Sequence, residues 1–505
     1  MKNERTKNAT RNAIFGILNR LVAIAFPFVI RTVMLYIMGS EYVGLNGLFT
    51  SILSFLSLAE LGVGQALVYS MYKPIAKQDK KTVCALLNLY RKLYRYIGTI
   101  ILVIGLALLP FLKYLLKDGC PETVNLYVLY LIYLFNTISS YWLFGYKQSL
   151  LVAHQRSDIV SKRSLVVQTL MYLAQILVLV LFRNYYAYII LLPIFTVITN
   201  LANSIIVDKM YPEYKCVGNV DKEIEQSIKK KVLALFGTKA NSVVMHALDN
   251  IVISAFLGLT MVAKYGNYYY IMNAIISIMT IIYSSLTAGL GNSIVVDKKE
   301  KVYKDFNTIS FMNAWIVTFC SASLICLFQP FMKIWVGEEL MFGMDIVILL
   351  AVYFYVYQIR RIILTYKDAG GIWWEDRFRP YIMMITNMVG NLILVQFIGI
   401  YGVILSTIIA MCVSWPWEIY TVFKYIFSFK AKEYAIKLVI YTASAAGLCA
   451  ATWLVCQLCP GDGILGLIIR AVVCVIIPNL GMFLLYNRQP EFKAMLGKVR
   501  SLIKR

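Results

Sequence analysis

The chain has 505 residues, of which 60% are hydrophobic and 15% are charged. Soluble globular domains are about 45–50% apolar, so this composition excludes an ordinary soluble protein and indicates a membrane protein. The 49 Lys and Arg against 26 Asp and Glu give a net charge of +23. Such a charge would suggest nucleic-acid binding in a soluble protein. No finger, RNP or helix-turn-helix pattern accompanies it here, and we expect no nucleic-acid partner.

Apolar stretches of about 20 residues, the length that crosses a hydrocarbon core of roughly 30 Å, recur along the whole chain. The sequence therefore predicts an all-α polytopic membrane protein with about fourteen spans. The predicted spans are 13–38, 47–72, 97–116, 125–147, 164–182, 187–207, 232–257, 266–290, 309–329, 344–366, 380–398, 402–423, 434–456 and 464–486. The polar, basic start lacks a cleavage site, so the first span is expected to remain in the protein.

Basic residues distinguish the two sides of the predicted membrane. The even-numbered connections are rich in Lys and Arg, as in KPIAKQDKK (73–81) and VDKKEKVYKDFN (296–307), whereas the odd ones, such as RNYY (183–186), are short. Positive charges accumulate on the cytoplasmic side. We therefore expect a multi-pass protein of the bacterial cytoplasmic membrane with both termini in the cytoplasm.

The longest connection divides the predicted spans into six plus eight. The predicted organisation is an N-lobe (1–207), a cytoplasmic linker (208–231), a C-lobe (232–430), two further spans (431–486) and a basic cytoplasmic tail (487–505). MGSEYVGLNG, from Met38, resembles LGLTMVAKYG, from Leu257. This echo indicates either an internal repeat, which is common in transporters, or a chance similarity between apolar segments.

Ionisable residues inside spans are costly and usually face a cavity or a partner. Arg20 and Arg31 lie eleven residues apart in the first span, which places them on one helix face. Glu60 lies in the middle of the second span. We expect the two arginines to be its partners, and Glu60 to be either a counter-ion or a coupling group. Snorkelling to the interface is the alternative for Arg31.

The seventh span carries a polar stripe with residue spacings of 3, 4 and 3, formed by Lys239, Ser242, His246 and Asp249. Three ionisable groups on one face favour a water-filled cavity. The eighth span carries Asn273, Ser277 and Thr280 at spacings of 4 and 3, which indicates either a ligand-facing stripe or a polar packing seam. Arg360 adds another charge in the tenth span, and the positive balance of these groups suits an anionic ligand.

No sequence motif indicates catalysis or a bound metal. There is no G-x-x-x-x-G-K-[ST] and no H-E-x-x-H, so we expect no enzyme activity. Cys456 and Cys459 form a lone C-x-x-C, and a zinc site would need two more ligands, of which the sequence shows no sign. We therefore expect no metal site and no cofactor, and we interpret the scattered cysteines as small apolar residues.

Four segments carry a resemblance to a known family: ELGVGQALVYS from Glu60, HALDNIVISAFLG from His246, DAGGIWWEDRFRP from Asp368, and GIYGVILST ending at Thr407. They resemble the polysaccharide transporter family of bacterial oligosaccharide-lipid flippases, within the MOP exporter superfamily. The resemblance implies a MATE-like, two-lobed bundle with two extra C-terminal helices. Its implied substrate is an undecaprenyl-pyrophosphate-linked oligosaccharide, flipped to the outer leaflet for O-antigen, capsule or another surface glycan.

Together, these patterns give a hypothesis for the mechanism. A cationic central cavity would hold the substrate by alternating access, through side chains drawn from Arg20, Arg31, Lys239, His246, Asn273, Ser277, Thr280 and Arg360. Glu60 and Asp249 would be counter-ions or would couple transport to H⁺ or Na⁺. Expected partners are the lipid-linked oligosaccharide, membrane lipids and polysaccharide polymerase or assembly proteins. The alternatives are a MATE-like cation or drug antiporter and a lipid II-type precursor flippase.

Overall fold

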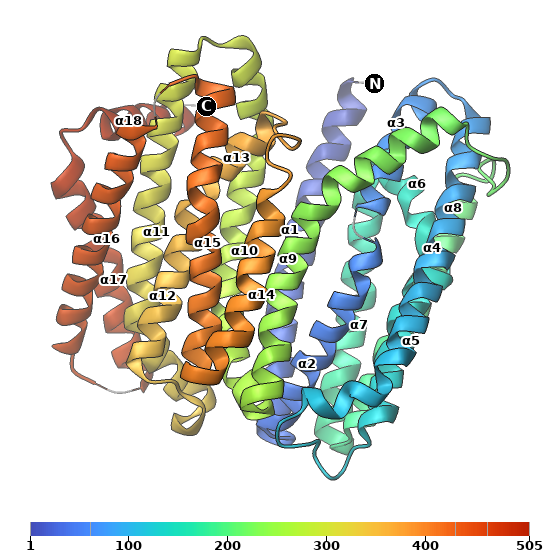
Figure 1. Ribbon diagram of the computed structural model, residues 1–505, viewed down its shortest axis with the longest axis horizontal. Helices are drawn as coiled ribbons and strands as arrows, with labels where there is room; N and C mark the ends of the chain where they lie inside the picture. The colour runs from blue at the N-terminus through green and yellow to red at the C-terminus, as the bar shows by residue number, and fades with distance from the viewer. Residues whose placement is uncertain (1, 61, 430, 462, 504–505) are drawn as a thin grey trace. The chain divides into compact units, whose positions relative to one another are not determined.

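The computed structural model describes residues 2–503 except 61, 430 and 462, and these residues form helices and connections without a strand. The chain divides into two compact units, unit 1 (Met1–Ala263) and unit 2 (Lys264–Arg505) (Figure 1). Within the described residues, twelve helices are long and apolar enough to cross a membrane, and a bent helix pair adds a thirteenth. The predicted all-α polytopic fold is therefore confirmed.

Unit 1 is built of helices that run back and forth along one direction (Figure 1). Its elements are α1 (Lys2–Ile37), α2 (Ser40–Leu56), η1 (Ser57–Glu60), α3 (Val63–Ala76), α4 (Lys80–Leu108), η2 (Leu109–Leu115), α5 (Leu126–Trp142), η3 (Gly145–Lys147), α6 (Gln148–Ala153), α7 (Ser157–Phe182), α8 (Tyr185–Met210) and α9 (Lys222–Leu257). Residues 222–231 of the predicted linker are thus already helical. Asp79 caps α4 by accepting a hydrogen bond from the Thr82 amide at 3.0 Å, which satisfies one free N–H of the first turn.

Unit 2 contains the remaining helices, except that α10 begins in the last residues of unit 1. Its elements are α10 (Leu259–Val296), α11 (Lys299–Val336), η4 (Glu338–Leu340), α12 (Met344–Ile359), α13 (Arg361–Ala369), α14 (Arg379–Ile398), α15 (Ile400–Val422), η5 (Phe423–Phe427), α16 (Lys432–Gln457), α17 (Gly463–Tyr486) and α18 (Pro490–Ile503). Helix α18 occupies most of the predicted tail, and Lys498 pairs with Asp305 of α11 at 2.7 Å.

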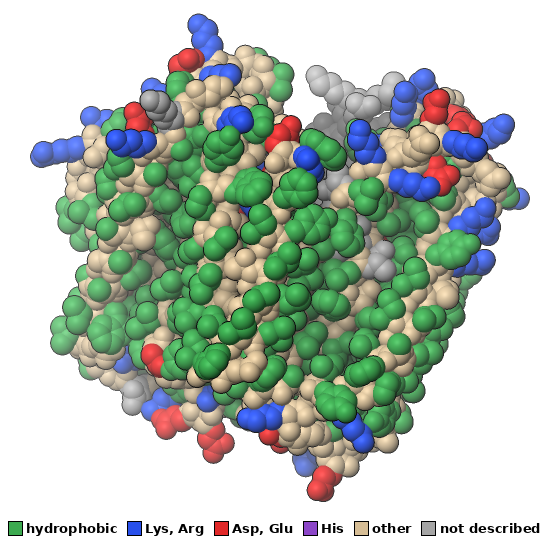
Figure 2. Space-filling model, in the orientation of Figure 1, with side chains coloured by type: hydrophobic (Ala, Val, Ile, Leu, Met, Phe, Trp, Pro, Cys, Tyr) green, Lys and Arg blue, Asp and Glu red, His purple; other side chains and the backbone are tan. Residues whose placement is uncertain are grey.

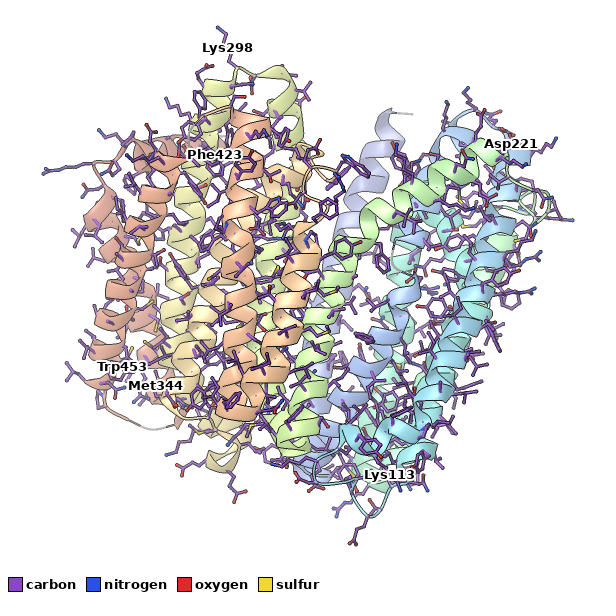
Figure 3. The ribbon with its side chains drawn as sticks, in the orientation of Figure 1. Lys113, Asp221, Lys298, Met344, Phe423 and Trp453 are labelled. Carbon is purple, nitrogen blue, oxygen red and sulfur yellow. The ribbon has the colours of Figure 1, made fainter. Side chains whose placement is uncertain are left out.

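Charged side chains gather at the helix ends, while apolar side chains cover the middle of each unit on the face in Figure 2. Figure 3 places Asp221 and Lys113 at opposite ends of unit 1. In unit 2 it places Lys298 at one end and both Met344 and Trp453 at the other. The labelled connections of each unit therefore lie at both ends of its helices, as expected for helices that run back and forth.

Two predicted spans are interrupted in the structure. The span predicted at 47–72 is divided, because α2 ends at Leu56 and the one-turn η1 follows. Gly62 then takes the left-handed conformation, with φ of 85°, which glycine adopts at little cost. The span predicted at 125–147 corresponds to α5 and the segment Gly145–Ala153, which meet at a bend of 48°.

The echoed sequences have the same backbone conformation. Gly39 precedes α2 with φ 101° and ψ 170°, and Gly258 precedes α10 with φ 91° and ψ 169°. Val43 and Val262, which correspond in the echo, are each 2% exposed. Shared conformation and burial favour an internal repeat over a chance similarity.

Gly44→Ala is expected to destabilise the protein by about 1–3 kcal/mol or more, as overpacking does. A Cβ at Gly44 would lie 2.0 Å from the backbone oxygen of Leu259, which cannot move aside as a side chain can. The matched control is Gly447→Ala in α16, where a Cβ would have no heavy atom within 4 Å. That control should stabilise its helix by roughly 0.5–1 kcal/mol. Thermal unfolding in detergent measures both, and equal melting temperatures would contradict this close α2–α10 contact.

Candidate functional site

Glu60 lies at the break between α2 and α3, where its carboxylate faces α4. Tyr94 donates its hydroxyl proton to Glu60 Oε1 at 3.0 Å, and Tyr90 donates to the Tyr94 hydroxyl at 3.1 Å. The two tyrosine rings pack edge to face with centroids 4.5 Å apart. A half-buried carboxylate therefore accepts the last hydrogen bond of a short hydroxyl chain.

Gly64 provides the space for this arrangement. A Cβ at this position would lie 2.7 Å from the Tyr90 hydroxyl and 3.3 Å from Glu60 Oε1. Any larger residue would therefore push the tyrosine away from the carboxylate. The two glycines of E-L-G-V-G, which begins at Glu60, thus have separate effects: Gly62 breaks the helix, and Gly64 leaves room for Tyr90.

One cavity in unit 1, here called the tyrosine cavity, has a volume of about 570 Å³. Its wall contains one carboxylate, five tyrosines, three amides and two serines. These are Glu60, Tyr69, Tyr72, Tyr90, Tyr94, Tyr141, Gln65, Gln148, Asn200, Ser140 and Ser149. This wall can donate and accept hydrogen bonds, and its tyrosine rings offer flat aromatic faces to a ligand.

The second cavity, here called the hydroxyl cavity, has a volume of about 540 Å³. Its polar lining is mostly hydroxyl groups, from Thr50, Ser54, Ser57, Tyr133, Thr137, Ser140, Tyr141 and Thr196, together with Asn136 and Glu60. Glu60, Ser140 and Tyr141 line both cavities. The carboxylate is therefore the shared charged group of two adjoining polar spaces.

The chemistry of this site follows from its donor set. A carboxylate among hydroxyl and amide oxygens can hold a hard cation, which prefers oxygen ligands, or it can take up a proton. The same groups can hydrogen-bond the hydroxyls of a sugar. Lys239 of α9 is close enough to act electrostatically on Glu60. The predicted partners Arg20 and Arg31 are not among the described contacts of this carboxylate.

The other predicted residues of unit 1 lie on α1 and α9. Arg20 is exposed, whereas Arg31 is half-buried and donates to the backbone oxygen of Ala263 at 3.0 Å. Lys239 and His246 are half-buried, and Asp249 is only 3% exposed. Arg31 thus connects α1 to the start of α10.

The three predicted residues of α10 that belong to unit 2 differ in exposure. Asn273 and Thr280 are exposed, and Ser277 is buried. The Thr280 hydroxyl donates to the backbone oxygen of Ile276 at 2.8 Å. This bond to the preceding turn occupies the donor of Thr280 within its own helix.

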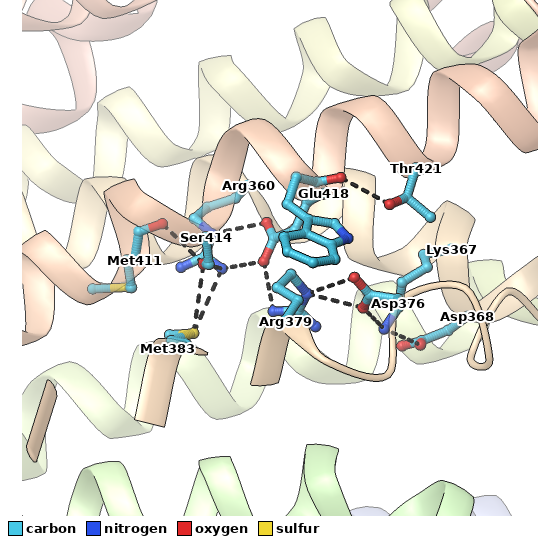
Figure 4. Close-up of polar contacts among 11 residues, drawn as sticks. Arg360, Lys367, Asp368, Asp376, Arg379, Met383, Met411, Ser414, Glu418 and Thr421 are labelled. Carbon is cyan, nitrogen blue, oxygen red and sulfur yellow. Dashed lines mark hydrogen bonds and ion pairs between the residues drawn. The ribbon is translucent and has the colours of Figure 1, made fainter. Parts of the chain in front are cut away.

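Arg360, which lies between α12 and α13, is part of a buried charge network rather than of a cavity (Figure 4). Its Nε donates to Glu418 Oε2 at 3.1 Å, and its Nη2 contacts Glu418 Oε1 and donates to Ser414 Oγ at 3.1 Å. Arg360 is 2% exposed and Glu418 is fully buried. The guanidinium is therefore occupied by partners inside unit 2, so we do not retain Arg360 as a substrate ligand.

The network continues into the segment that carries the family resemblance. Arg379 donates to Glu418 Oε1 at 2.8 Å and to Asp376 at 2.9 Å, and Lys367 donates to Asp376 Oδ2 at 2.9 Å. All these groups are at least 95% buried. Asp376 and Arg379 thus anchor this connection to unit 2 through a chain of alternating charges, three positive and two negative.

The two tryptophans of the same connection lie outside this network. Trp373 is 50% exposed and Trp374 is 61% exposed, and the Arg377 guanidinium stacks over Trp374 at 4.2 Å. An exposed Trp beside a charged group is typical of the interfacial aromatic belt. This placement favours an interfacial position for the two tryptophans.

Sequence reasoning missed Tyr90, Tyr94 and Glu418. Glu418 had a usable signal, because a lone carboxylate inside an apolar span requires a cationic partner. Tyr90 and Tyr94 had only a weak signal, since tyrosine is common throughout this chain, with 36 in total.

No protein-family model and no curated protein matches the sequence. Among solved structures, the chain is similar to the lipid II flippase MurJ in an inward closed conformation, with a TM-score of 0.68 and 14% identity over 94% of this chain and 98% of that one. It is similar to an inward-facing multidrug resistance MATE family transporter of the MOP superfamily, with a TM-score of 0.57 and 15% identity over 78% and 93%. A third is a MOP superfamily transporter from Pyrococcus furiosus, with a TM-score of 0.52 and 14% identity over 82% and 94%.

At sequence identities of 14% and 15%, the structural similarity shows that the fold is shared. The predicted MATE- and MOP-like helical bundle is confirmed, and the solved structures it matches are flippases and transporters of the MOP superfamily. The match to MurJ covers more of this chain than the match to the MATE transporter does. The narrower resemblance to the polysaccharide transporter family stays a prediction.

Proposed function

We propose that this protein flips an undecaprenyl-pyrophosphate-linked oligosaccharide across the bacterial cytoplasmic membrane for the synthesis of a surface polysaccharide, by alternating access. The observation that carries the proposal is the wall of the tyrosine cavity inside a transporter fold. Sugar hydroxyls need hydrogen-bonding partners, and the three amides and two serines of that wall supply them. The flat rings of its tyrosines match the apolar faces of sugar rings.

The pyrophosphate needs a cationic site, for which Arg20 and Lys239 are the candidates. Guanidinium binds phosphate oxygens through two parallel hydrogen bonds, and the Arg20 side chain is exposed on α1. His246, Asn273 and Ser277 remain candidate contacts to the polar head group, and so does the exposed Thr280. Arg31 is assigned to the contact between α1 and Ala263.

Glu60 is the proposed coupling group, with Asp249 as the second candidate. Burial disfavours a charged carboxylate, so binding a proton or Na⁺ at Glu60 would lower the cost of placing it inside the membrane. The hydroxyl chain from Tyr90 through Tyr94 can respond to that change, because its last hydrogen bond ends on the carboxylate. Coupled uptake at Glu60 would supply the driving force for the cycle.

A MATE-like cation or drug antiporter is the second candidate function. Glu60, an acid, is the one charged side chain among the described residues lining the two cavities. An acidic, aromatic wall attracts organic cations. A lipid II-type precursor flippase is a third reading, supported by the likeness to MurJ, and it differs from our proposal only in the glycan carried.

Arg20→Ala is expected to reduce leaflet exchange of a lipid-pyrophosphate-linked oligosaccharide in proteoliposomes at least about tenfold. A charge-assisted hydrogen bond contributes about 1.5–3 kcal/mol, and each 1.4 kcal/mol is a factor of ten. The matched control is Arg183→Ala, which removes an exposed arginine from the end of α7. Normal exchange by the Arg20 variant, at equal amounts of folded protein, would remove this residue from the substrate site.

A further inference from the structure

Three cysteines from three helices of unit 2 meet inside the protein. They are Cys326 of α11, Cys456 of α16 and Cys474 of α17, and their Sγ atoms all lie within 4.8 Å of one another. Their exposures are 5%, 3% and 1%. Because any two of them are at least 18 positions apart in the chain, the fold and not a local motif brings them together.

We propose that this trio, here called the thiolate site, binds a single thiophilic metal ion, and that the ion is Cu(I). Metal–thiolate bonds are about 2.3 Å long, so three sulfurs in a plane around one ion lie about 4.0 Å apart. The observed limit of 4.8 Å is close enough for small side-chain rotations to bring the sulfurs to that spacing. The three helices need not move.

The three sulfur ligands determine which metal ion the site prefers. Three sulfurs without a carboxylate or imidazole are soft ligands, which favour Cu(I) and Zn(II) over Mg²⁺ or Ca²⁺. Structural zinc is almost always four-coordinate, whereas the group of metal-ligating side chains found among the described residues contains three cysteines. Three sulfur ligands therefore favour Cu(I), which accepts trigonal coordination.

An arginine lies beside the thiolate site. Arg470 Nε donates to the backbone oxygen of Cys456 at 3.4 Å, and Arg470 precedes Cys474 by one helical turn of α17. A cation inside an apolar span is costly. A metal–thiolate centre carries net negative charge, since bound thiols release their protons, and it would supply the counter-charge that Arg470 needs.

The bound ion would join the two trailing helices to the rest of unit 2. Helices α16 and α17 pack on α11, and the ion would add a bond from each of them to that helix. A ligand that binds the folded state alone raises its stability. The site thus predicts that copper strengthens the attachment of α16 and α17.

The test uses the full-length protein, purified in detergent without oxygen, and incubated with Cu(I) against a competing chelator. We expect one copper per chain after desalting, a sulfur-to-copper charge-transfer absorption band and a melting temperature raised by several degrees. Cys456→Ser and Cys474→Ser should each lose all three signals. Cys320→Ser, a half-buried cysteine on α11 outside the trio, should keep them.

Each other outcome contradicts the proposal. Copper retained equally by a variant with serine at all three positions would place the metal elsewhere. Zinc binding in the same assay, with no retention of Cu(I), would overturn the choice of ion. Absence of any bound metal would mean that the trio is a packed group of thiols. None of these measurements involves transport, so the result does not depend on the proposed function.

Discussion

Glu60→Gln is expected to reduce coupled substrate transport at least about tenfold while leaving the fold intact. The amide oxygen can still accept the hydrogen bond that Tyr94 now donates to Oε1, so the tyrosine chain keeps its partner. The amide cannot bind a proton or hold a sodium ion as a carboxylate does. A charge-assisted interaction contributes about 1.5–3 kcal/mol, and 1.4 kcal/mol corresponds to tenfold.

The control for this experiment is Glu41→Gln, which changes an exposed carboxylate in α2. Transport is measured in proteoliposomes under an imposed proton gradient and, separately, under a sodium gradient. The control should match the parent under both. If Glu60→Gln also matched the parent under both gradients, Glu60 would be a structural group, and Asp249 would become the coupling candidate.

Glu418→Ala is expected to destabilise unit 2 by about 3–5 kcal/mol, the cost of removing one partner from a buried ion pair. Arg360 and Arg379 both donate to this fully buried carboxylate. Its removal leaves two guanidinium groups without their shared acceptor in the protein interior. Glu418→Gln keeps an acceptor oxygen but removes the charge, so its melting temperature should fall between those of the parent and the alanine variant.

The surface pair of Glu338 with Lys333 provides the matched control. Glu338 accepts from Lys333 at 2.8 Å, but its side chain is 72% exposed. Surface pairs contribute about 0–1 kcal/mol, so Glu338→Ala should melt close to the parent. Similar melting temperatures for the two alanine variants would show that the buried network does not hold unit 2 together.

The all-helical, polytopic fold could be predicted from the sequence because the bilayer fixes the length of an apolar span, although fourteen spans were predicted and the described residues contain twelve, or thirteen with the bent pair. The helix break at Gly62 was harder to predict, because a positive φ at a single glycine does not change the pattern of apolar residues along the chain. Its sequence signal is the pair of glycines two and four residues after Glu60, at Gly62 and Gly64. The pattern E-x-G-x-G inside a span indicates a helix end where an acid meets a neighbouring helix.

Contacts between distant segments could not be predicted. Helix periodicity places side chains on one face of their own helix, but it does not show which helix that face meets. Arg360 therefore looked like a cavity residue until Glu418 was found beside it. In the same way, the C-x-x-C spacing of Cys456 and Cys459 gives no sign that the fold places Cys456 beside Cys326 and Cys474.

The most direct test of the proposed function compares two substrates with the parent protein in the same proteoliposomes. One is a lipid-pyrophosphate-linked oligosaccharide, followed by its accessibility in the outer leaflet, and the other is a fluorescent organic cation. The account predicts rapid leaflet exchange of the oligosaccharide lipid, accelerated by a proton or sodium gradient, and no export of the cation. Export of the cation against its gradient, without exchange of the oligosaccharide lipid, would contradict the account and establish the antiporter.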